Sequence, residues 1–201
     1  LMEKDPTIVD DIEWILQDFS DETTLKNENK WPMVECAVYG DQVKRSGGGY
    51  QSAWHFDDEE FLAKDITEDE VTISSNPKNI TSAMPILHAW LSGEDVTGEF
   101  AYESIMKRVD NEEAGKSLAL RLLIHYYGDI HQPLHSVGRV SKENPKGDKG
   151  GNGFGLKYHL GAKNLHSLWD SVMYTYRKTM HRPFSQDTWN FVGVFASELL
   201  S

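Results

Sequence analysis

Two pairs of residues in this chain combine a histidine with an aspartate four positions later: His125 with Asp129, and His166 with Asp170. Residues four apart project from the same face of an α-helix, so each pair can close two positions around one metal ion. Imidazole nitrogen and carboxylate oxygen together suit zinc, whereas magnesium prefers oxygen ligands. The spacing therefore predicts zinc sites that are carried by helices.

The stretch that follows His125 is dense in possible ligands, because it also contains His131 and His135. Pro133 redirects the chain, so His135 need not continue along the helix and can face a second metal ion. A lone His–Asp pair is more often a buried hydrogen-bonded pair than a metal site. Two such pairs together with His135 favour metal binding, because burying either residue type without a partner is costly. We expect His131 to lie at the surface or behind the ligands.

Helices must position these residues, and the apolar periodicity predicts where they run. We expect helices over residues 6–19, 32–44, 80–91 and 112–130, and another that begins after Asn164 as its N-cap. We expect 51–61 to be extended or irregular, 142–155 to be a loop, and 156–160 to be a short strand. The fold class is therefore mainly α: a single bundle-like domain over residues 1–201, with its metal sites between facing helices.

The charge balance limits the possible partners of the chain. Its 201 residues include 20 basic and 32 acidic ones, and the formal net charge of −12 opposes the phosphate attraction that drives duplex-DNA binding. Any work on nucleic acid must use local positive charge, which bound divalent metal ions would supply. No apolar run approaches the ~20 residues that cross a bilayer. We predict no membrane span and no obligate protein partner.

Cysteine usage and a glycosylation pattern point to different compartments. Cys36 is the only cysteine, so the chain can form no internal disulfide and no Cys-rich zinc module. Against a reducing compartment, Asn79-Ile80-Thr81 matches the N-glycosylation acceptor pattern, which makes Asn79 a candidate glycosylation site. The first residues do not look like a signal peptide. We expect the sequence to be truncated at both ends relative to a full-length enzyme.

Four motifs occur in order along the chain. They are Trp54-His55-Phe56-Asp57-Asp58, the helix 119–135 that ends in His131-Gln132-Pro133-Leu134-His135, Gly150-Gly151-Asn152, and Asn164-Leu165-His166-Ser167-Leu168-Trp169-Asp170. Together they resemble the zinc-dependent single-strand-specific nucleases, the class I nucleases of the S-one/P-one type in fungi and plants. The resemblance implies a fold shared with bacterial zinc phospholipases C and a trinuclear zinc site between helices.

The resemblance also implies which residues hold the metal. One zinc would be held by Asp41, His55, His125 and Asp129, with Asp129 bridging to another zinc. The next zinc would be held by His135, His166 and Asp170. In this family the remaining ligands come from an N-terminal Trp and a nearby His, and neither is found in this chain. We therefore expect up to three zinc ions, with one site incomplete in this chain.

Catalytic and substrate-binding roles follow from the same resemblance. Asp41 would orient the attacking water, and Lys44 stands where the family has an Arg that stabilises the developing charge. Arg45 is adjacent and could take that part. Phe56 would stack on an unpaired base and Asp58 would bind its edge. Two residues of the Gly-rich loop, Asp148 and Asn152, are further candidates for substrate contact.

The resemblance implies hydrolysis of single-stranded DNA and RNA to 5'-nucleotides, with 3'-nucleotidase activity as an accompanying possibility. Two alternatives stay open: a zinc phospholipase C, which an aromatic cage for choline would favour, and a zinc-binding remnant without activity. The resemblance also suggests a secreted or lysosomal/vacuolar glycoprotein. The lack of disulfides weakens that last suggestion.

Overall fold

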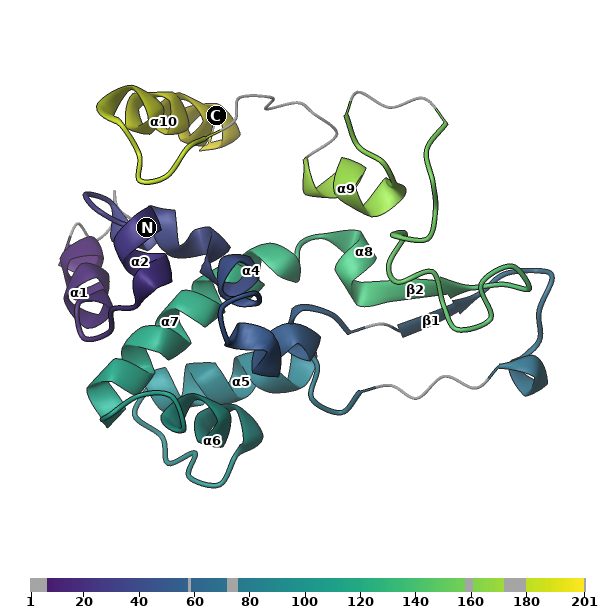
Figure 1. The fold of residues 1–201 in the computed structure, drawn as a ribbon, viewed down its shortest axis with the longest axis horizontal. Helices are drawn as coiled ribbons and strands as arrows, with labels where there is room; N and C mark the ends of the chain where they lie inside the picture. The colour runs from purple at the N-terminus through teal and green to yellow at the C-terminus, as the bar shows by residue number, and fades with distance from the viewer. Residues whose placement is uncertain (1–6, 58, 72–75, 158–160, 172–179, 201) are drawn as a thin grey trace. The chain divides into compact units, whose positions relative to one another are not determined.

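The computed structural model describes residues 7–57, 59–71, 76–157, 161–171 and 180–200 (Figure 1). Its helices and strands, in chain order, are α1 (Thr7–Leu16), α2 (Glu22–Asn27), α3 (Pro32–Glu35), η1 (Cys36–Val38), α4 (Tyr39–Val43), η2 (Gly48–His55), β1 (Glu59–Leu62), η3 (Glu68–Glu70), α5 (Ile80–Leu91), α6 (Phe100–Met106), α7 (Glu112–Asp129), α8 (Pro133–Ser136), β2 (Val137–Val140), α9 (Leu165–Asp170) and α10 (Gln186–Leu200). The η elements are 3-10 helices. The mainly α fold class is confirmed.

Several predicted elements match the structure closely. The helix expected over 80–91 is α5, and the helix expected over 112–130 is α7, which ends at Asp129. Pro133 does not end α7 itself; it stands at the first turn of α8, where its missing N–H leaves no bond unmade. Asn164 caps α9 as expected, because its side chain accepts a hydrogen bond from the Ser167 backbone N–H.

The chain forms two compact units. The first unit contains residues 1–50, 86–125 and 179–201, and the second contains 51–85 and 126–178. Helix α7 passes from the first unit into the second between His125 and Tyr126. The single catalytic domain expected over residues 1–201 stays a prediction.

The core of the first unit is built on α7. Its apolar side chains Leu118, Ala119 and Leu122 are buried. One turn earlier, a Cβ at Gly115 would lie 2.7 Å from the ring of Trp90 and 2.8 Å from the sulfur of Met106. Only glycine lets α5 and α6 approach α7 this closely at that point.

The helix expected over residues 32–44 is divided into three pieces in the first unit. Helix α3 ends at Glu35, the 3-10 turn η1 follows, and α4 begins at Tyr39. The buried Glu35 carboxylate accepts hydrogen bonds from the backbone N–H groups of Asn29, Trp31 and Phe184. The tighter turn at η1 changes the direction of the chain, and this places the Ala37 carbonyl beside a histidine of α7.

The second unit contains the two strands, which the sequence did not predict. Strands β1 and β2 are parallel, with Phe61 opposite Arg139 in the register. The stretch 51–61, expected to be extended or irregular, is helical up to His55 and extended from Glu59. Part of the strand expected over 156–160 lies outside the described residues; next to it, Gly155 forms an isolated antiparallel bridge with Asn164.

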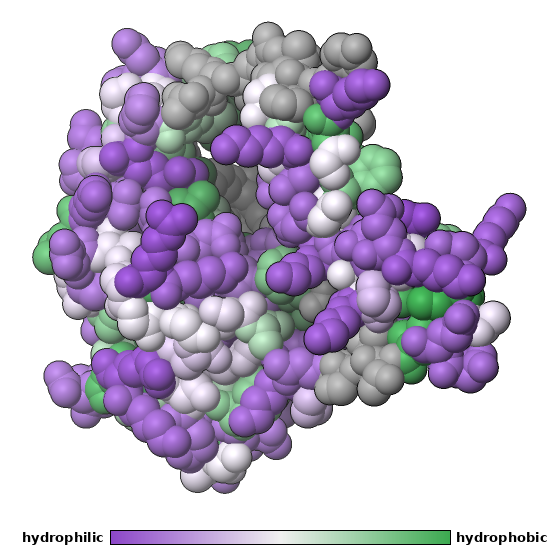
Figure 2. Space-filling model, turned by 45° about the vertical axis from the view of Figure 1, so that its right-hand side comes forward, coloured by the Kyte–Doolittle hydropathy of each residue, from purple (hydrophilic) through white to green (hydrophobic). Residues whose placement is uncertain are grey.

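The surface drawn in Figure 2 is mostly hydrophilic, and apolar residues show on it in small patches. This agrees with the strongly acidic composition. Among the helices that the structure describes, none combines the length and apolar character needed to cross a membrane.

Candidate metal centre

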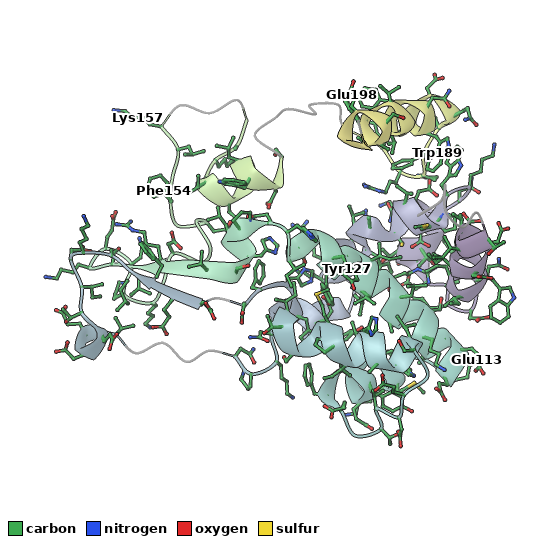
Figure 3. All side chains as sticks on the ribbon, turned by 180° about the vertical axis from the view of Figure 1, so that it is seen from behind. Glu113, Tyr127, Phe154, Lys157, Trp189 and Glu198 are labelled. Carbon is green, nitrogen blue, oxygen red and sulfur yellow. The ribbon has the colours of Figure 1, made fainter. Side chains whose placement is uncertain are left out.

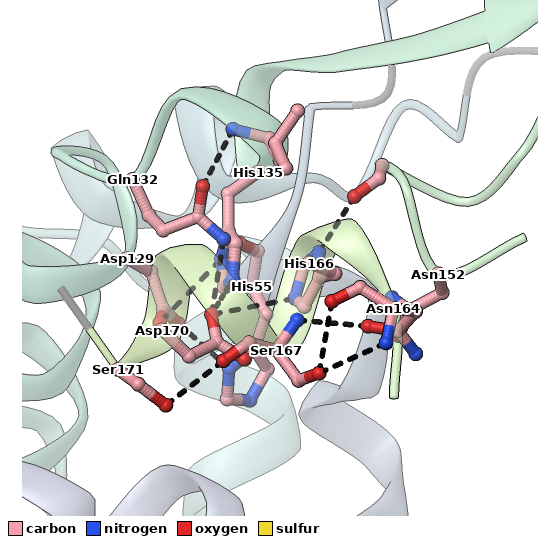
Figure 4. A network of polar contacts seen from close by, with 12 residues as sticks. His55, Asp129, Gln132, His135, Asn152, Asn164, His166, Ser167, Asp170 and Ser171 are labelled. Atoms are coloured by element: carbon pink, nitrogen blue, oxygen red, sulfur yellow. Dashed lines mark hydrogen bonds and ion pairs between the residues drawn. The ribbon is translucent and has the colours of Figure 1, made fainter. Parts of the chain in front are cut away.

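The second unit brings His135, His166 and Asp170 together (Figure 4). The Nε2 atoms of His135 and His166 lie 3.9 and 3.6 Å from Oδ1 of Asp170. The two imidazole rings stack with their centroids 4.9 Å apart and their planes within 16° of parallel. Both histidines are buried, while the Asp170 side chain is 48% exposed. Two nitrogens and one carboxylate oxygen thus converge on one point that solvent can reach.

The other ring nitrogen of each of these histidines is held by the backbone. The Nδ1–H of His166 donates to the carbonyl of Gly150 over 2.7 Å, and the Nδ1–H of His135 donates to the carbonyl of His55 over 2.9 Å. A carbonyl oxygen can only accept, so we assign the proton of each neutral ring to Nδ1. The lone pair therefore lies on Nε2, the atom that faces Asp170.

Gly150 has a structural task that follows from this geometry. Its φ of 58° is in the left-handed region, and a Cβ there would lie 2.0 Å from the carbonyl oxygen of Leu134. Glycine is therefore required for the loop to pass between α8 and α9 and to present its carbonyl to His166. The sequence drew attention to Asp148 and Asn152 of this loop but gave Gly150 itself no role in orienting a ligand.

His55 lies in a fully buried chain of polar contacts in the same unit. Its Nε2 is 2.6 Å from Oε1 of Gln51, and the hydroxyl of Tyr126 also donates to that oxygen over 2.6 Å. Because an amide oxygen only accepts, Nε2 carries a proton. The opposite nitrogen, Nδ1, lies 2.7 Å from Oδ2 of Asp129.

This contact between Nδ1 of His55 and Asp129 needs a positive charge between the two atoms. In neutral His55 the Nδ1 lone pair would face a carboxylate oxygen, and two acceptors repel each other at 2.7 Å. A proton shared by the two atoms removes this repulsion, whereas zinc, with bonds of about 2.0–2.2 Å to each atom, would lie beside the line that joins them. A zinc ion that replaces the proton would satisfy both groups, and its binding would release a proton.

His135 is held in the form that binds metal. Burial lowers its pKa, which the carboxylate of Asp129 partly opposes. The ring is therefore neutral at neutral pH, and neutral imidazole is the form that ligates metal. Oδ1 of Asp129 lies 3.5 Å from Nδ1 of His135, while its Oδ2 faces His55.

The first unit carries Asp41 and His125, the other two predicted ligands. The Nδ1–H of His125 donates to the carbonyl of Ala37 over 2.7 Å, so its Nε2 carries the lone pair and lies 3.9 Å from Oδ1 of Asp41. A Cβ on Gly40 would lie 2.5 Å from the imidazole of His125. Glycine is therefore the only residue that fits at position 40, directly before Asp41. Lys44 donates to Oδ1 of Asp41 over 2.9 Å.

Comparison with known proteins identifies the family. The family model described as S1/P1 nuclease matches residues 6–198. The chain belongs to the S1/P1 nuclease family. Members of this family are zinc-dependent in general. The donor set described above fits that metal, because it combines imidazole nitrogens with carboxylate oxygens.

Individual relatives match a shorter stretch of this chain. Endonuclease 4 of Arabidopsis thaliana is 44% identical over 55 residues, which are 27% of this chain and 16% of the relative. Endonuclease 1 of the same plant is 46% identical over 52 residues, 26% of this chain and 15% of the relative. Nuclease S1 of Aspergillus oryzae is 44% identical over 55 residues, which are 27% of this chain and 16% of the relative. The matched stretch thus covers about a sixth of the length of these curated relatives.

The predicted base-binding residue Phe56 lies against the candidate metal centre. Its ring centroid is 4.6 Å from that of His135 and 6.1 Å from that of His166. The side chain of Phe56 is half-buried, so it borders the candidate metal centre and is not part of the hydrophobic core. Asp58 lies outside the described residues. Asp57 is fixed: its N–H donates to the His135 carbonyl over 2.8 Å, and its carboxylate accepts from Asn79.

The two predicted substrate contacts in the Gly-rich loop differ in their surroundings. Asp148 is 7% exposed, and its Oδ1 accepts from the N–H groups of Arg139 and Gly151, each over 3.0 Å. It therefore holds the loop onto β2. Asn152 is exposed and accepts a long hydrogen bond, 3.3 Å, from the side chain of Asn164. Its position leaves it accessible to a ligand.

A polar cleft of about 690 Å³ opens beside Asp41 in the first unit. Three cationic side chains line it: Lys26, Lys44 and Arg45. Sequence reasoning considered Lys44 and Arg45 but missed Lys26, which is at the last turn of α2. No spacing in the sequence relates Lys26 to Asp41, so the fold alone reveals it.

Proposed function

We propose that this chain is the catalytic part of a zinc-dependent phosphodiesterase that hydrolyses single-stranded DNA and RNA to 5'-nucleotides. The observation that carries this proposal is the convergence of His135, His166 and Asp170, with both Nε2 lone pairs directed to one point. A cluster that only stabilised the fold would use both nitrogens of each ring in hydrogen bonds. We include 3'-nucleotidase activity in the proposal, because the resemblance implies it.

We assign the metal ligands as the resemblance implies. Of up to three zinc ions, one would be held by Asp41, His55, His125 and Asp129. A second would be held by His135, His166 and Asp170. Asp129 would bridge to another zinc, as the resemblance implies; its Oδ2 lies 2.7 Å from Nδ1 of His55. The hydrogen bonds from Nδ1 of His125, His135 and His166 to backbone carbonyls support the assignment, because such bonds fix the tautomer of imidazoles that bind metal.

The residues around the metal ligands have distinct tasks in this mechanism. Bound zinc would lower the pKa of a water molecule and neutralise the charge of the phosphate oxygens. The carboxylate of Asp41 is 62% exposed and can accept a hydrogen bond from the attacking water, which orients it. Lys44 lies against Asp41, and Arg45 lines the same cleft, so either cation can approach the phosphate.

The preference for single strands would come from Phe56. A base can stack on its ring only when it is unpaired, and such stacking contributes about 1–3 kcal/mol per base with little sequence preference. The half-buried ring lies beside His135 and His166, where a base next to the scissile phosphate would be placed. Asn152 can donate to the edge of that base. By resemblance, the carboxylate of Asp58 would accept hydrogen bonds from the edge of that base.

We also propose a secreted or lysosomal/vacuolar location with a glycan on Asn79. The Asn79 side chain caps α5: its Oδ1 accepts the N–H of Ser82 over 3.0 Å, and its Nδ2 donates to Asp57. One N–H of the amide is thus engaged, and the other is the position for the sugar. Mass spectrometry of the protein from its native source tests this directly, and an unmodified Asn79 would contradict it.

The test of the proposed function uses the complete native protein. Hydrolysis of a single-stranded oligonucleotide is compared with that of its duplex, before chelation, after chelation and after return of zinc. We expect cleavage of the single strand that is lost with the metal and restored by zinc, with 5'-phosphate on the products. Zinc binding without cleavage of any nucleic acid would reject the nuclease function, and hydrolysis of phosphatidylcholine instead would show a phospholipase C.

A further inference from the structure

An apolar pocket of about 420 Å³ lies in the second unit, outside the ligand set described above. Phe61 of β1, Val137 of β2, Leu134 of α8, Leu165 of α9 and Phe154 of the loop before α9 line it. The two phenylalanine side chains are 60% and 48% exposed. Neither ring is therefore used to fill the core of this unit, although each presents a large apolar face.

The pocket is joined to the metal centre through the backbone. Leu134 directly precedes His135, and Leu165 directly precedes His166. The N–H of Leu165 donates to the carbonyl of Phe154 over 3.0 Å, which ties the loop to the start of α9 (Figure 3 shows Phe154 on this loop). The chain neighbours of the two proposed zinc ligands thus form part of the pocket wall. A ligand in the pocket would lie next to whatever occupies the metal centre.

Two charged residues, Arg139 and Asp148, are among the lining residues of the pocket, and the Asp148 side chain is buried and turned to backbone N–H groups. Arg139 is opposite Phe61 in the parallel register, and its side chain is exposed. The backbone N–H of Arg139 is held by Asp148, whose Oδ1 also accepts from Gly151. This fixes the strand that carries Arg139 against the Gly-rich loop. In a chain of net charge −12, a cation beside exposed aromatic rings favours an anionic, flat ligand.

We propose that this pocket binds a second base of the single-stranded substrate, stacked on Phe154 and Phe61, with Arg139 on an adjoining phosphate. This proposal rests on the proposed function. The volume is in the range of small-molecule sites and accommodates one nucleobase. Aromatic rings with a neighbouring cation are the combination by which proteins hold single strands without reading their sequence. The chain would thus bind two bases of its substrate, one on Phe56 and one in this pocket.

The experiment measures the affinity of the zinc-loaded full chain for an uncleavable single-stranded oligonucleotide in which one base at a time is removed. We expect that removing the base at one position away from the scissile phosphate weakens binding about tenfold, a typical effect of one stacked base. In the Phe154→Ala protein the intact oligonucleotide binds about tenfold more weakly, and removal of that same base has no further effect. Phe154→Trp retains binding, because it retains a ring.

Three controls separate the possible outcomes. Trp14→Ala removes an aromatic residue of α1 that is 69% exposed, and it leaves the affinity unchanged. Zinc content shows that Phe154→Ala has kept its metal centre. If the native protein cleaves single strands but no base position depends on Phe154, the pocket proposal is wrong and the proposed function stands. If the native protein cleaves no nucleic acid, the proposed function itself fails. Binding of lipid vesicles that depends on Phe154 while oligonucleotide binding does not would also overturn the pocket proposal.

Discussion

Two buried polar clusters of this molecule make opposite use of their hydrogen-bonding atoms. In the first unit, Arg121 donates to both carboxylate oxygens of Glu28, to the hydroxyl of Ser117 and to the carbonyl of Leu16, all within a buried environment. In the second unit, His135 and His166 each anchor one nitrogen on a carbonyl and direct the other to Asp170.

The difference separates a structural cluster from a binding one. The Arg121 cluster is closed, because its charges and donors are satisfied by the chain itself. The histidine cluster is open, because two Nε2 lone pairs face the carboxylate of Asp170, whose Oδ1 also accepts a hydrogen bond from Gln132 over 3.0 Å, and a metal cation can join these donors. Burial of polar groups alone therefore does not identify a site. The direction of the lone pairs does, and this direction is set by residues such as Gly150 that take no part in the chemistry.

The largest effect is expected from removing a ligand of the open cluster. His166→Ala deletes one nitrogen donor, and we expect nuclease activity to fall by at least about 1000-fold, since a bound metal contributes several kcal/mol to the transition state. His88→Ala, which removes an exposed histidine of α5, is the matched control and keeps full activity. Activity and zinc content are measured together. Retention of both in His166→Ala would contradict the open cluster as a metal site.

A substitution in the closed cluster should lower the stability of the protein and not act on the metal site. Arg121→Met leaves the buried carboxylate of Glu28 without its partner, and we expect a loss of about 3–5 kcal/mol in the free energy of unfolding. Lys116→Met removes one partner of the exposed pair with Glu112, where solvent screens the attraction and we expect no measurable loss of stability. Denaturant unfolding measures both. An equally small effect at Arg121 would show that its cluster is not structural.

An intermediate effect is expected from Gln51, which holds Nε2 of His55. Gln51→Leu removes the acceptor that fixes the tautomer of the ring, and we expect zinc affinity to fall about 10–100-fold. Gln17→Leu makes the same change at an exposed position and leaves the affinity unaltered. A zinc titration against a competing chelator gives both values. Unchanged affinity in Gln51→Leu would mean that His55 does not depend on this hydrogen bond for metal binding.

The smallest effect is expected at Cys36, beside the closed cluster. Burial raises the pKa of its thiol to about 12, and Glu28 adds to the shift while Arg121 opposes it. At pH 8 the thiolate is then about 1000-fold rarer than in an ordinary cysteine with a pKa near 8.5. Iodoacetamide should therefore modify Cys36 only after denaturation. Rapid alkylation of the native protein would show that this region opens.

The sequence suggested candidate ligand residues but did not predict the contacts between them. Spacing along one helix related Asp129 to His125, but the closest histidine to Asp129 in the second unit is His55, which is 74 residues away in the chain. Gln51 was missed, although its position four residues before His55 is a signal of the same kind as the His–Asp pairs. A pattern search restricted to His and Asp could not find it.

The strands and the 3-10 turns escaped prediction for physical reasons. Strand β1 has only four residues, and its first three are all exposed, so no alternation of apolar and polar residues marks it. The turn at η1 interrupts an apolar pattern that favours one continuous helix. The Ala37 carbonyl that orients His125 therefore could not be foreseen. The long, periodic helices α5 and α7 were predicted almost to the residue because their burial pattern repeats over several turns.

The most direct test of the open cluster is a crystal structure of the zinc-loaded protein with an anomalous difference map measured at the zinc absorption edge. We expect a peak bonded to Nε2 of His135, Nε2 of His166 and a carboxylate oxygen of Asp170, with the Gly150 carbonyl still accepting from Nδ1 of His166. A map with no zinc at these three residues, or with zinc bonded to Nδ1 of either histidine, would contradict the assignment of the lone pairs.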